Sequence, residues 1–142
     1  MRKVDIVGYR VEAGSGDDCI REIARTLRQD RRDCAWMARL NPHSYASARR
    51  DAVFRQALQS AHWLIPDGVG IVIAGRILGS RIRERITGFD IFEGVMTELD
   101  RTNGSVFFLG STEQTLNAIV ERLPRDYPQV RIAGVYSPSF KP

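Results

Sequence analysis

The stretch AHWLIPDGVGIVIAGRIL, residues 61–78, decides the fold. Its first five residues form a short apolar run that PDG, residues 66–68, ends abruptly, which predicts a buried strand. Residues 69–78 continue as an apolar run of helical length, and Gly79 follows in a position suited to end a helix. A strand, a tight turn and a helix in succession form the unit from which parallel sheets are built.

The rest of the chain repeats this alternation. Strands are predicted for an alternating segment or small hairpin at 5–11, a mostly apolar run at 34–40, and β-prone segments at 105–110 and 130–135. Helices are predicted from Asp17 as cap to about 28–31, in two pieces across 42–60 broken near 48–51, from Thr87 onward, and from Ser111 or Thr112 to 123. The predicted class is α/β: a mostly parallel sheet flanked by helices and joined by right-handed crossovers.

The composition fits one globular domain in a reducing compartment. The chain has 142 residues and 43% apolar content, enough for one compact core. Its net charge of +4 does not require a nucleic-acid partner, and an anionic ligand or an acidic membrane surface fits it equally well. No apolar run reaches the roughly 20 residues of a membrane span or has the pattern of a signal peptide. Cys19 and Cys34 lack metal-binding spacing, so we expect two buried thiols in a cytoplasmic protein.

The carboxyl end of the chain carries its own expectation. Residues 134–142 continue from a predicted strand into a loop, and no helix is predicted after that loop. We therefore expect residues 1–142 to form one domain that is truncated at its carboxyl end. Apolar surface left exposed by such a truncation would favour self-association into a homo-oligomer.

Three predicted strands end in polar or glycine-bearing residues. Asn41 follows the first, Asp67-Gly68 the second, and Gly110-Ser111 the third. In open parallel sheets, ligands bind beyond the carboxyl ends of the strands, where loops and helix amino termini meet. A crevice among these three strand ends is the expected site.

Asp67 and Asn41 each have a functional and a structural interpretation. An aspartate that is partly shielded from water can act as a general base toward a hydroxyl, and Gly68 would permit close approach of the ligand. Asp67 can equally cap the following helix. Asn41 can hydrogen-bond a sugar hydroxyl or, because it precedes a proline, belong to an ordinary turn.

Phosphate could be bound at two further places. The Gly110-Ser111 junction can offer backbone amides at a helix start, although such junctions are also common in proteins that bind nothing there. A basic cluster can bind a diphosphate or remain a solvated face, and it consists of Arg76, Arg81, Arg83 and Arg85. The glycine fingerprints of dinucleotide and Walker-type sites are absent, and no Asp-x-Asp motif predicts a metal.

The order and separation of five short motifs resemble one known family. The motifs are Leu40-Asn41-Pro42-His43-Ser44-Tyr45, Ile65-Pro66-Asp67-Gly68-Val69-Gly70, Glu84-Arg85-Ile86-Thr87-Gly88-Phe89-Asp90, Phe107-Phe108-Leu109-Gly110 and Tyr136-Ser137-Pro138. They cover the chain from about residue 5 to its last residue, and they resemble the WecG/TagA/CpsF glycosyltransferases.

The resemblance implies a Rossmann-like α/β domain. It also implies inverting transfer of an N-acetylhexosamine-type sugar, typically N-acetylmannosamine, from a UDP donor. The implied acceptor is a polyprenyl-diphosphate-linked saccharide at the inner face of the cell membrane, used in bacterial cell-wall or exopolysaccharide synthesis. No cofactor or metal is expected. By motif, Asp67 would be the base, Asn41 would line the sugar pocket and Arg85 would face the diphosphate. The remaining substrate-binding residues would be Gly68, Asp90, Gly110 and Ser111.

Two features depart from the family pattern. Many relatives carry threonine where this chain has Arg39, which implies an altered pocket or a different donor. Relatives also continue into a further active-site segment and a basic tail, so this chain alone is expected to be weakly active or inactive. The alternative is a non-catalytic nucleotide-binding or oligomerising module derived from the same family.

Overall fold

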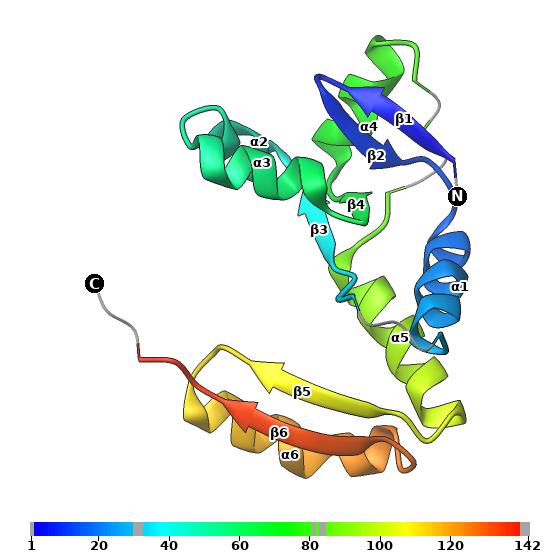
Figure 1. Ribbon diagram of the computed structural model, residues 1–142, viewed down its shortest axis with the longest axis vertical. Helices are drawn as coiled ribbons and strands as arrows, with labels where there is room; N and C mark the ends of the chain where they lie inside the picture. The colour runs from blue at the N-terminus through cyan, green and yellow to red at the C-terminus, as the bar shows by residue number, and fades with distance from the viewer. Residues whose placement is uncertain (1, 30–32, 81, 83–84, 140–142) are drawn as a thin grey trace. The chain divides into compact units, whose positions relative to one another are not determined.

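The computed structural model describes residues 2–29, 33–80, 82 and 85–139. The chain divides into two compact units, Met1–Phe92 and Glu93–Pro142, and each is described by itself. Figure 1 labels the elements. In chain order they are β1 (Lys3–Ile6), β2 (Tyr9–Glu12), α1 (Gly16–Leu27), β3 (Met37–Leu40), α2 (Pro42–Ala48), α3 (Ala52–Ser60), β4 (Trp63–Pro66), α4 (Val69–Ile77), α5 (Gly88–Arg101), β5 (Ser105–Leu109), α6 (Glu113–Asp126) and β6 (Arg131–Tyr136).

The first unit opens with the hairpin predicted for residues 5–11. β1 and β2 pair antiparallel, and α1 follows. Ser15 caps α1: its hydroxyl accepts from the Asp18 amide, and the Asp18 carboxylate accepts from the Ser15 amide. The prediction of Asp17 as the cap was wrong, because the reciprocal Ser15–Asp18 pair satisfies the helix start and leaves Asp17 in the first turn.

β3 and β4 form a parallel pair that α2 and α3 connect. The break between the two helices lies at residues 49–51, as predicted. β3 is shorter than the predicted run at 34–40, because its pairing with β4 begins only at Met37 opposite Trp63. Cys34 is consequently exposed, so the prediction of buried thiols is correct for Cys19 and wrong for Cys34.

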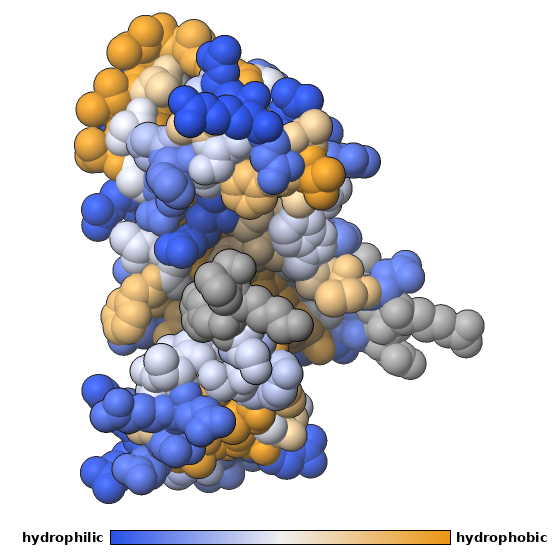
Figure 2. All heavy atoms as spheres, turned by 90° about the vertical axis from the view of Figure 1, so that its left-hand side faces the viewer, coloured by the Kyte–Doolittle hydropathy of each residue, from blue (hydrophilic) through white to orange (hydrophobic). Residues whose placement is uncertain are grey.

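The core of the first unit lies among the hairpin, β3, β4 and the helices that follow them. Its buried members are Ile6, Tyr9, Val11, Leu40, Ala48, Leu58, Leu64, Ile71, Val72 and Ile82. α4 is apolar on more than its buried side, because Val69, Ile73 and Ile77 are exposed. Figure 2 shows apolar surface near the top of the view, at the height where Figure 1 draws α4 and the β1–β2 hairpin.

The second unit is a parallel pair, β5 and β6, with α6 along one face (Figure 1). Met96 of α5, Leu123 of α6 and Val130 form its buried core, and Phe108 packs against them. Phe107 is exposed, because successive side chains of a strand point to opposite faces.

The α/β class is confirmed, with short parallel strand pairs flanked by helices. The described strands form three separate pairs, one antiparallel and two parallel, and not one continuous sheet. α5 runs without interruption through the boundary between the two units. That residues 1–142 act as a single domain stays a prediction.

Candidate active site

The carboxyl ends of β3 and β4 lie side by side. Leu40 is opposite Pro66, and the Asp67 amide donates to the Leu40 carbonyl over 2.9 Å. The turns that follow pack closely, because a Cβ atom at Gly70 would lie 3.0 Å from the Pro42 side chain. Two of the three expected strand ends therefore meet, and they bring Asn41, Asp67 and Gly68 to one edge.

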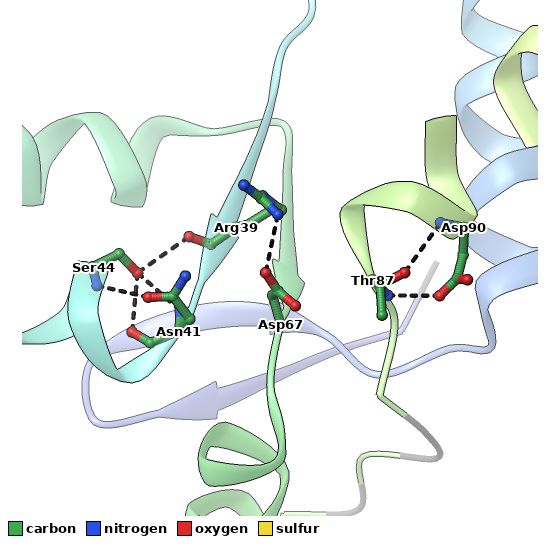
Figure 3. Close-up of polar contacts among 6 residues, drawn as sticks. All are labelled: Arg39, Asn41, Ser44, Asp67, Thr87 and Asp90. Carbon is green, nitrogen blue, oxygen red and sulfur yellow. Dashed lines mark hydrogen bonds and ion pairs between the residues drawn. The ribbon is translucent and has the colours of Figure 1, made fainter. Parts of the chain in front are cut away.

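The Asp67 carboxylate binds Arg39 and does not cap the next helix (Figure 3). Arg39 Nη1 donates to Asp67 Oδ2 over 3.2 Å, and the Asp67 side chain is 19% exposed. Gly68 occupies the N-cap of α4 with a φ of 96°, and no side chain caps that helix. The helix-cap interpretation of Asp67 is therefore wrong. The carboxylate is partly shielded at a strand end, where it can accept a hydrogen bond from a hydroxyl.

Strand geometry explains why Arg39 reaches Asp67. Arg39 is opposite Ile65, and side chains two positions apart in a strand point the same way, so Asp67 lies on the side of Arg39. The guanidinium also lies against the first residue of α5, because a Cβ atom at Gly88 would be 2.8 Å from Nη1. The sequence marked Arg39 only as a departure from a family pattern. The two-residue strand period was the signal that could have paired it with Asp67.

Asn41 is the N-cap of α2. Its Oδ1 accepts from the Ser44 amide over 2.8 Å, and the Asn41 amide donates to Ser44 Oγ over the same distance. Asn41 thus has a structural role, but as a helix cap and not as part of the ordinary turn that was predicted, and the functional interpretation is still open. The Asn41 side-chain nitrogen forms no hydrogen bond with the described residues and can donate to a ligand.

The turn that begins α5 carries Asp90 and Arg85. The Thr87 amide donates to Asp90 Oδ2 over 2.8 Å, and the Asp90 amide donates to the Thr87 hydroxyl, which confirms Thr87 as the cap (Figure 3). Hydrogen bonding with Thr87 lowers the pKa of Asp90, and the positive charge of Arg85 lowers it slightly further. Arg85 is exposed. Of the basic cluster, Arg81 and Arg83 lie outside the described residues, as does Glu84 of the motif.

Gly110 and Ser111 belong to the second unit, at the carboxyl end of β5. The Gly110 amide donates to the Tyr136 carbonyl over 2.9 Å, so it is not available to a phosphate in this conformation. Ser111 has a φ of 62°, and its carbonyl accepts from Ser137 Oγ. Thr112 caps α6, which decides between the two predicted starts of that helix. The substrate-binding roles of Gly110 and Ser111 stay predictions.

The edge of β3 and β4 can hold a polar ligand through three kinds of group. Asp67 can accept from a hydroxyl, Asn41 can donate from its amide, and Arg39 can donate to an anion. In the described ranges, no group of three or more His, Cys, Asp or Glu side chains could hold a metal ion. No helix within those ranges has the length and apolar character needed to cross a membrane.

The chain is thus an α/β protein with polar groups at the carboxyl edge of a parallel strand pair, which is where α/β proteins generally bind small ligands. The comparison with known families narrows this class. Residues 4–142 match the glycosyl transferase WecG/TagA/CpsF family, and the chain belongs to that family.

Three curated relatives carry the same name, N-acetylglucosaminyldiphosphoundecaprenol N-acetyl-beta-D-mannosaminyltransferase. The protein of Bacillus spizizenii is 31% identical over 111 residues, which cover 78% of this chain and 43% of the relative. The protein of Bacillus subtilis is 27% identical with the same coverage. The protein of Staphylococcus aureus strain NCTC 8325 is 22% identical over 131 residues, 92% of this chain and 52% of the relative. The chain thus spans about half the length of these relatives.

Proposed function

We propose that this chain is part of an inverting glycosyltransferase that moves an N-acetylhexosamine-type sugar, N-acetylmannosamine, from UDP to a polyprenyl-diphosphate-linked acceptor. The reaction would serve bacterial cell-wall or exopolysaccharide synthesis. Family membership supports the sugar transfer, and the names of the relatives support this sugar and acceptor. The observation that carries the chemistry is Asp67: a partly shielded carboxylate beside Asn41, with no part in capping α4.

In the proposed reaction, Asp67 takes the proton of the acceptor hydroxyl through Oδ1, the oxygen that Arg39 does not contact. The hydroxyl oxygen forms a bond to the anomeric carbon while the bond from that carbon to the diphosphate oxygen breaks. UDP leaves on the opposite side, so a single displacement inverts the anomeric centre. Arg85 would stabilise the negative charge that grows on the diphosphate.

The other proposed substrate-binding residues are Asn41, Gly68, Asp90, Gly110 and Ser111. The proposed reaction takes place in the cytoplasm at the inner face of the membrane, because the acceptor is lipid-linked. It uses no cofactor or metal and involves no nucleic acid. Full activity in EDTA would support metal independence, and a loss that Mg²⁺ or Mn²⁺ restores would contradict it. Self-association of the chain is also proposed, since apolar residues of α4 are exposed.

Replacement of Asp67 tests the proposed base. In the full-length protein, we expect Asp67→Asn to lower kcat by roughly 10²- to 10⁴-fold, because asparagine keeps the shape but cannot take the proton. UDP affinity, measured by calorimetry, should stay nearly unchanged, because the asparagine side-chain oxygen can still accept the hydrogen bond from Arg39 Nη1. Asp17→Asn, an exposed aspartate of α1, is the control with the same change in charge. Wild-type turnover by the Asp67 variant would remove it as the base.

A non-catalytic nucleotide-binding or oligomerising module is the second candidate. The ion pair of Arg39 with Asp67 favours it, because Arg39 occupies one oxygen of the candidate base. Titration of the chain with UDP, NAD and ATP separates the classes. Selective binding of UDP supports the glycosyltransferase lineage, and preference for NAD would contradict it. Selective binding of UDP without transfer by the full-length protein would support the module.

A further inference from the structure

We propose that Arg39 binds a phosphate of the nucleoside-diphosphate ligand, while Asp67 holds the guanidinium in position for that contact. This inference rests on the proposed function, because the UDP-type ligand is part of that proposal. It gives this chain a phosphate-binding residue that neither the family match nor the names of the relatives assign.

The hydrogen-bonding capacity of Arg39 is mostly unused. A guanidinium carries five N–H donors in a planar fork that matches phosphate oxygens. The side chain of Arg39 is 52% exposed, and its single hydrogen bond to a described residue is the one to Asp67. The remaining donors lie at the carboxyl edge of a parallel strand pair, where ligands of α/β proteins bind.

A purely structural role explains this ion pair poorly. Pairs as exposed as this one contribute little to stability, because water screens the attraction and two side chains lose freedom. The bond to Asp67 does restrict the guanidinium before any ligand arrives. Restriction in advance lowers the entropic penalty of binding, which favours a role for Arg39 in ligand recognition.

The surroundings of the guanidinium also favour an anion. Arg39 lies against Gly88, the first residue of the 14-residue helix α5. The amino end of a helix carries partial positive charge, so a cation beside it is unfavourable in the empty protein. The amides of Gly88 and Phe89 form no hydrogen bond with a described residue, which is usual for the first turn of a helix. Asp67 and Asp90 supply negative charge here in the empty protein, and a phosphate near Arg39 would add acceptors for the guanidinium donors that Asp67 leaves unused.

The test is calorimetric titration of this chain with UDP and, separately, with uridine. We expect Arg39→Gln to weaken UDP binding by roughly tenfold to a hundredfold, the range for a charge-assisted hydrogen bond, and to leave uridine binding unchanged. Arg55→Gln, an exposed arginine of α3, makes the same change in charge and should bind UDP like wild type. The UDP affinity of Arg39→Lys should lie between those of the wild type and Arg39→Gln, because lysine keeps the positive charge but lacks the planar fork of donors.

The outcomes distinguish this inference from the proposed function. If the wild type does not bind UDP, the proposed function fails and the inference with it. If the wild type binds UDP and Arg39→Gln binds it equally well, the inference alone is overturned. An equal loss for UDP and uridine would also overturn it, because that pattern indicates a disturbed site without a phosphate contact.

Gly88→Ala provides a second, independent variant. Its methyl group would displace the guanidinium, which is the far end of a flexible side chain, so the fold should persist. We expect weaker UDP binding in the wild-type background and no further loss in the Arg39→Gln background. Equal losses in both backgrounds would show that the methyl group acts without Arg39, and would count against the inference.

Discussion

Among single residues, Glu12 of β2 is the one charged residue in the described ranges that is buried. Its side chain is fully buried, and Lys3 Nζ lies 3.3 Å from Oε1. This distance allows an ion pair, but the geometry does not align a hydrogen bond, and neither carboxylate oxygen has a hydrogen-bonding partner among the described residues. Burial raises the pKa of Glu12, and the charge of Lys3 opposes that rise only in part.

The raised pKa of Glu12 predicts how stability depends on pH. The folded protein holds this proton more tightly than the unfolded chain, so the resulting stabilisation is present at low pH and is lost as pH rises through the folded pKa. We expect Glu12→Gln to raise Tm at about pH 8, where the buried charge is removed, with little difference at about pH 4. Lys3→Gln, which removes the partner charge, should lower Tm at the higher pH. A lower Tm for Glu12→Gln at about pH 8 would contradict this account.

The sequence predicted the site residue by residue but not its contacts. Asp67, Gly68 and Asn41 could be placed at one edge because each directly follows a predicted strand. The contacts of Arg39 with Asp67 and Gly88 depend on the register of two strands and on the path of the chain back to α5. Both are long-range features that a local pattern does not contain.

Among the helices and strands, α2 is capped by Asn41, which we also propose to contact the ligand. Two substitutions separate these two roles. Asn41→Ala removes the acceptor for the Ser44 amide and should cost about 1 kcal/mol of stability. Asn41→Asp keeps that acceptor but lacks the amide donor, so we expect near-wild-type stability by denaturant unfolding and weaker ligand binding. Unchanged UDP-sugar affinity in Asn41→Asp would leave Asn41 as a cap alone.

Helix α4 packs against the hairpin through Gly75. A Cβ atom there would lie 2.9 Å from Ile82 Cδ1 and 3.2 Å from Ile6 Cδ1, all within the core. We expect Gly75→Ala to destabilise the protein by about 1–3 kcal/mol through overpacking. Ile82→Val removes the nearer atom, so the double variant should lose less than the sum of the single losses in urea unfolding. Additive losses would show that Ile82 is not the source of the clash.

Element boundaries were predicted well where a local signal begins or ends the element. Gly79 and the cap Thr87 are such signals. The cap of α1 was misplaced because Ser15 and Asp17 both suit that position, and only the reciprocal hydrogen bonds with Asp18 decide between them. The amino end of β3 was misplaced because apolar residues precede Met37, while a strand begins where its partner begins.

For the whole molecule, the α/β class followed from the alternation of elements, but the strand pairing did not. Within the part of the chain that the structure describes, β1 and β2 pair only with each other, and the other strands form the pairs β3–β4 and β5–β6. Pairing is decided by contacts between segments distant in sequence, which periodicity within a segment does not encode. The prediction of a single domain therefore needs a test of cooperativity.

Helix α5 makes that test possible, because it runs from Gly88 to Arg101 and contributes to both compact units. If residues 1–142 form one domain, calorimetry of the wild type should show one transition, with equal calorimetric and van't Hoff enthalpies. Gly94→Pro breaks α5 near its middle, at a cost of about 3 kcal/mol, and should split unfolding into two transitions. Gly94→Ala, which strengthens the helix, should keep one transition at a higher Tm. Two transitions in the wild type would show that the units unfold separately and that the single-domain prediction is wrong.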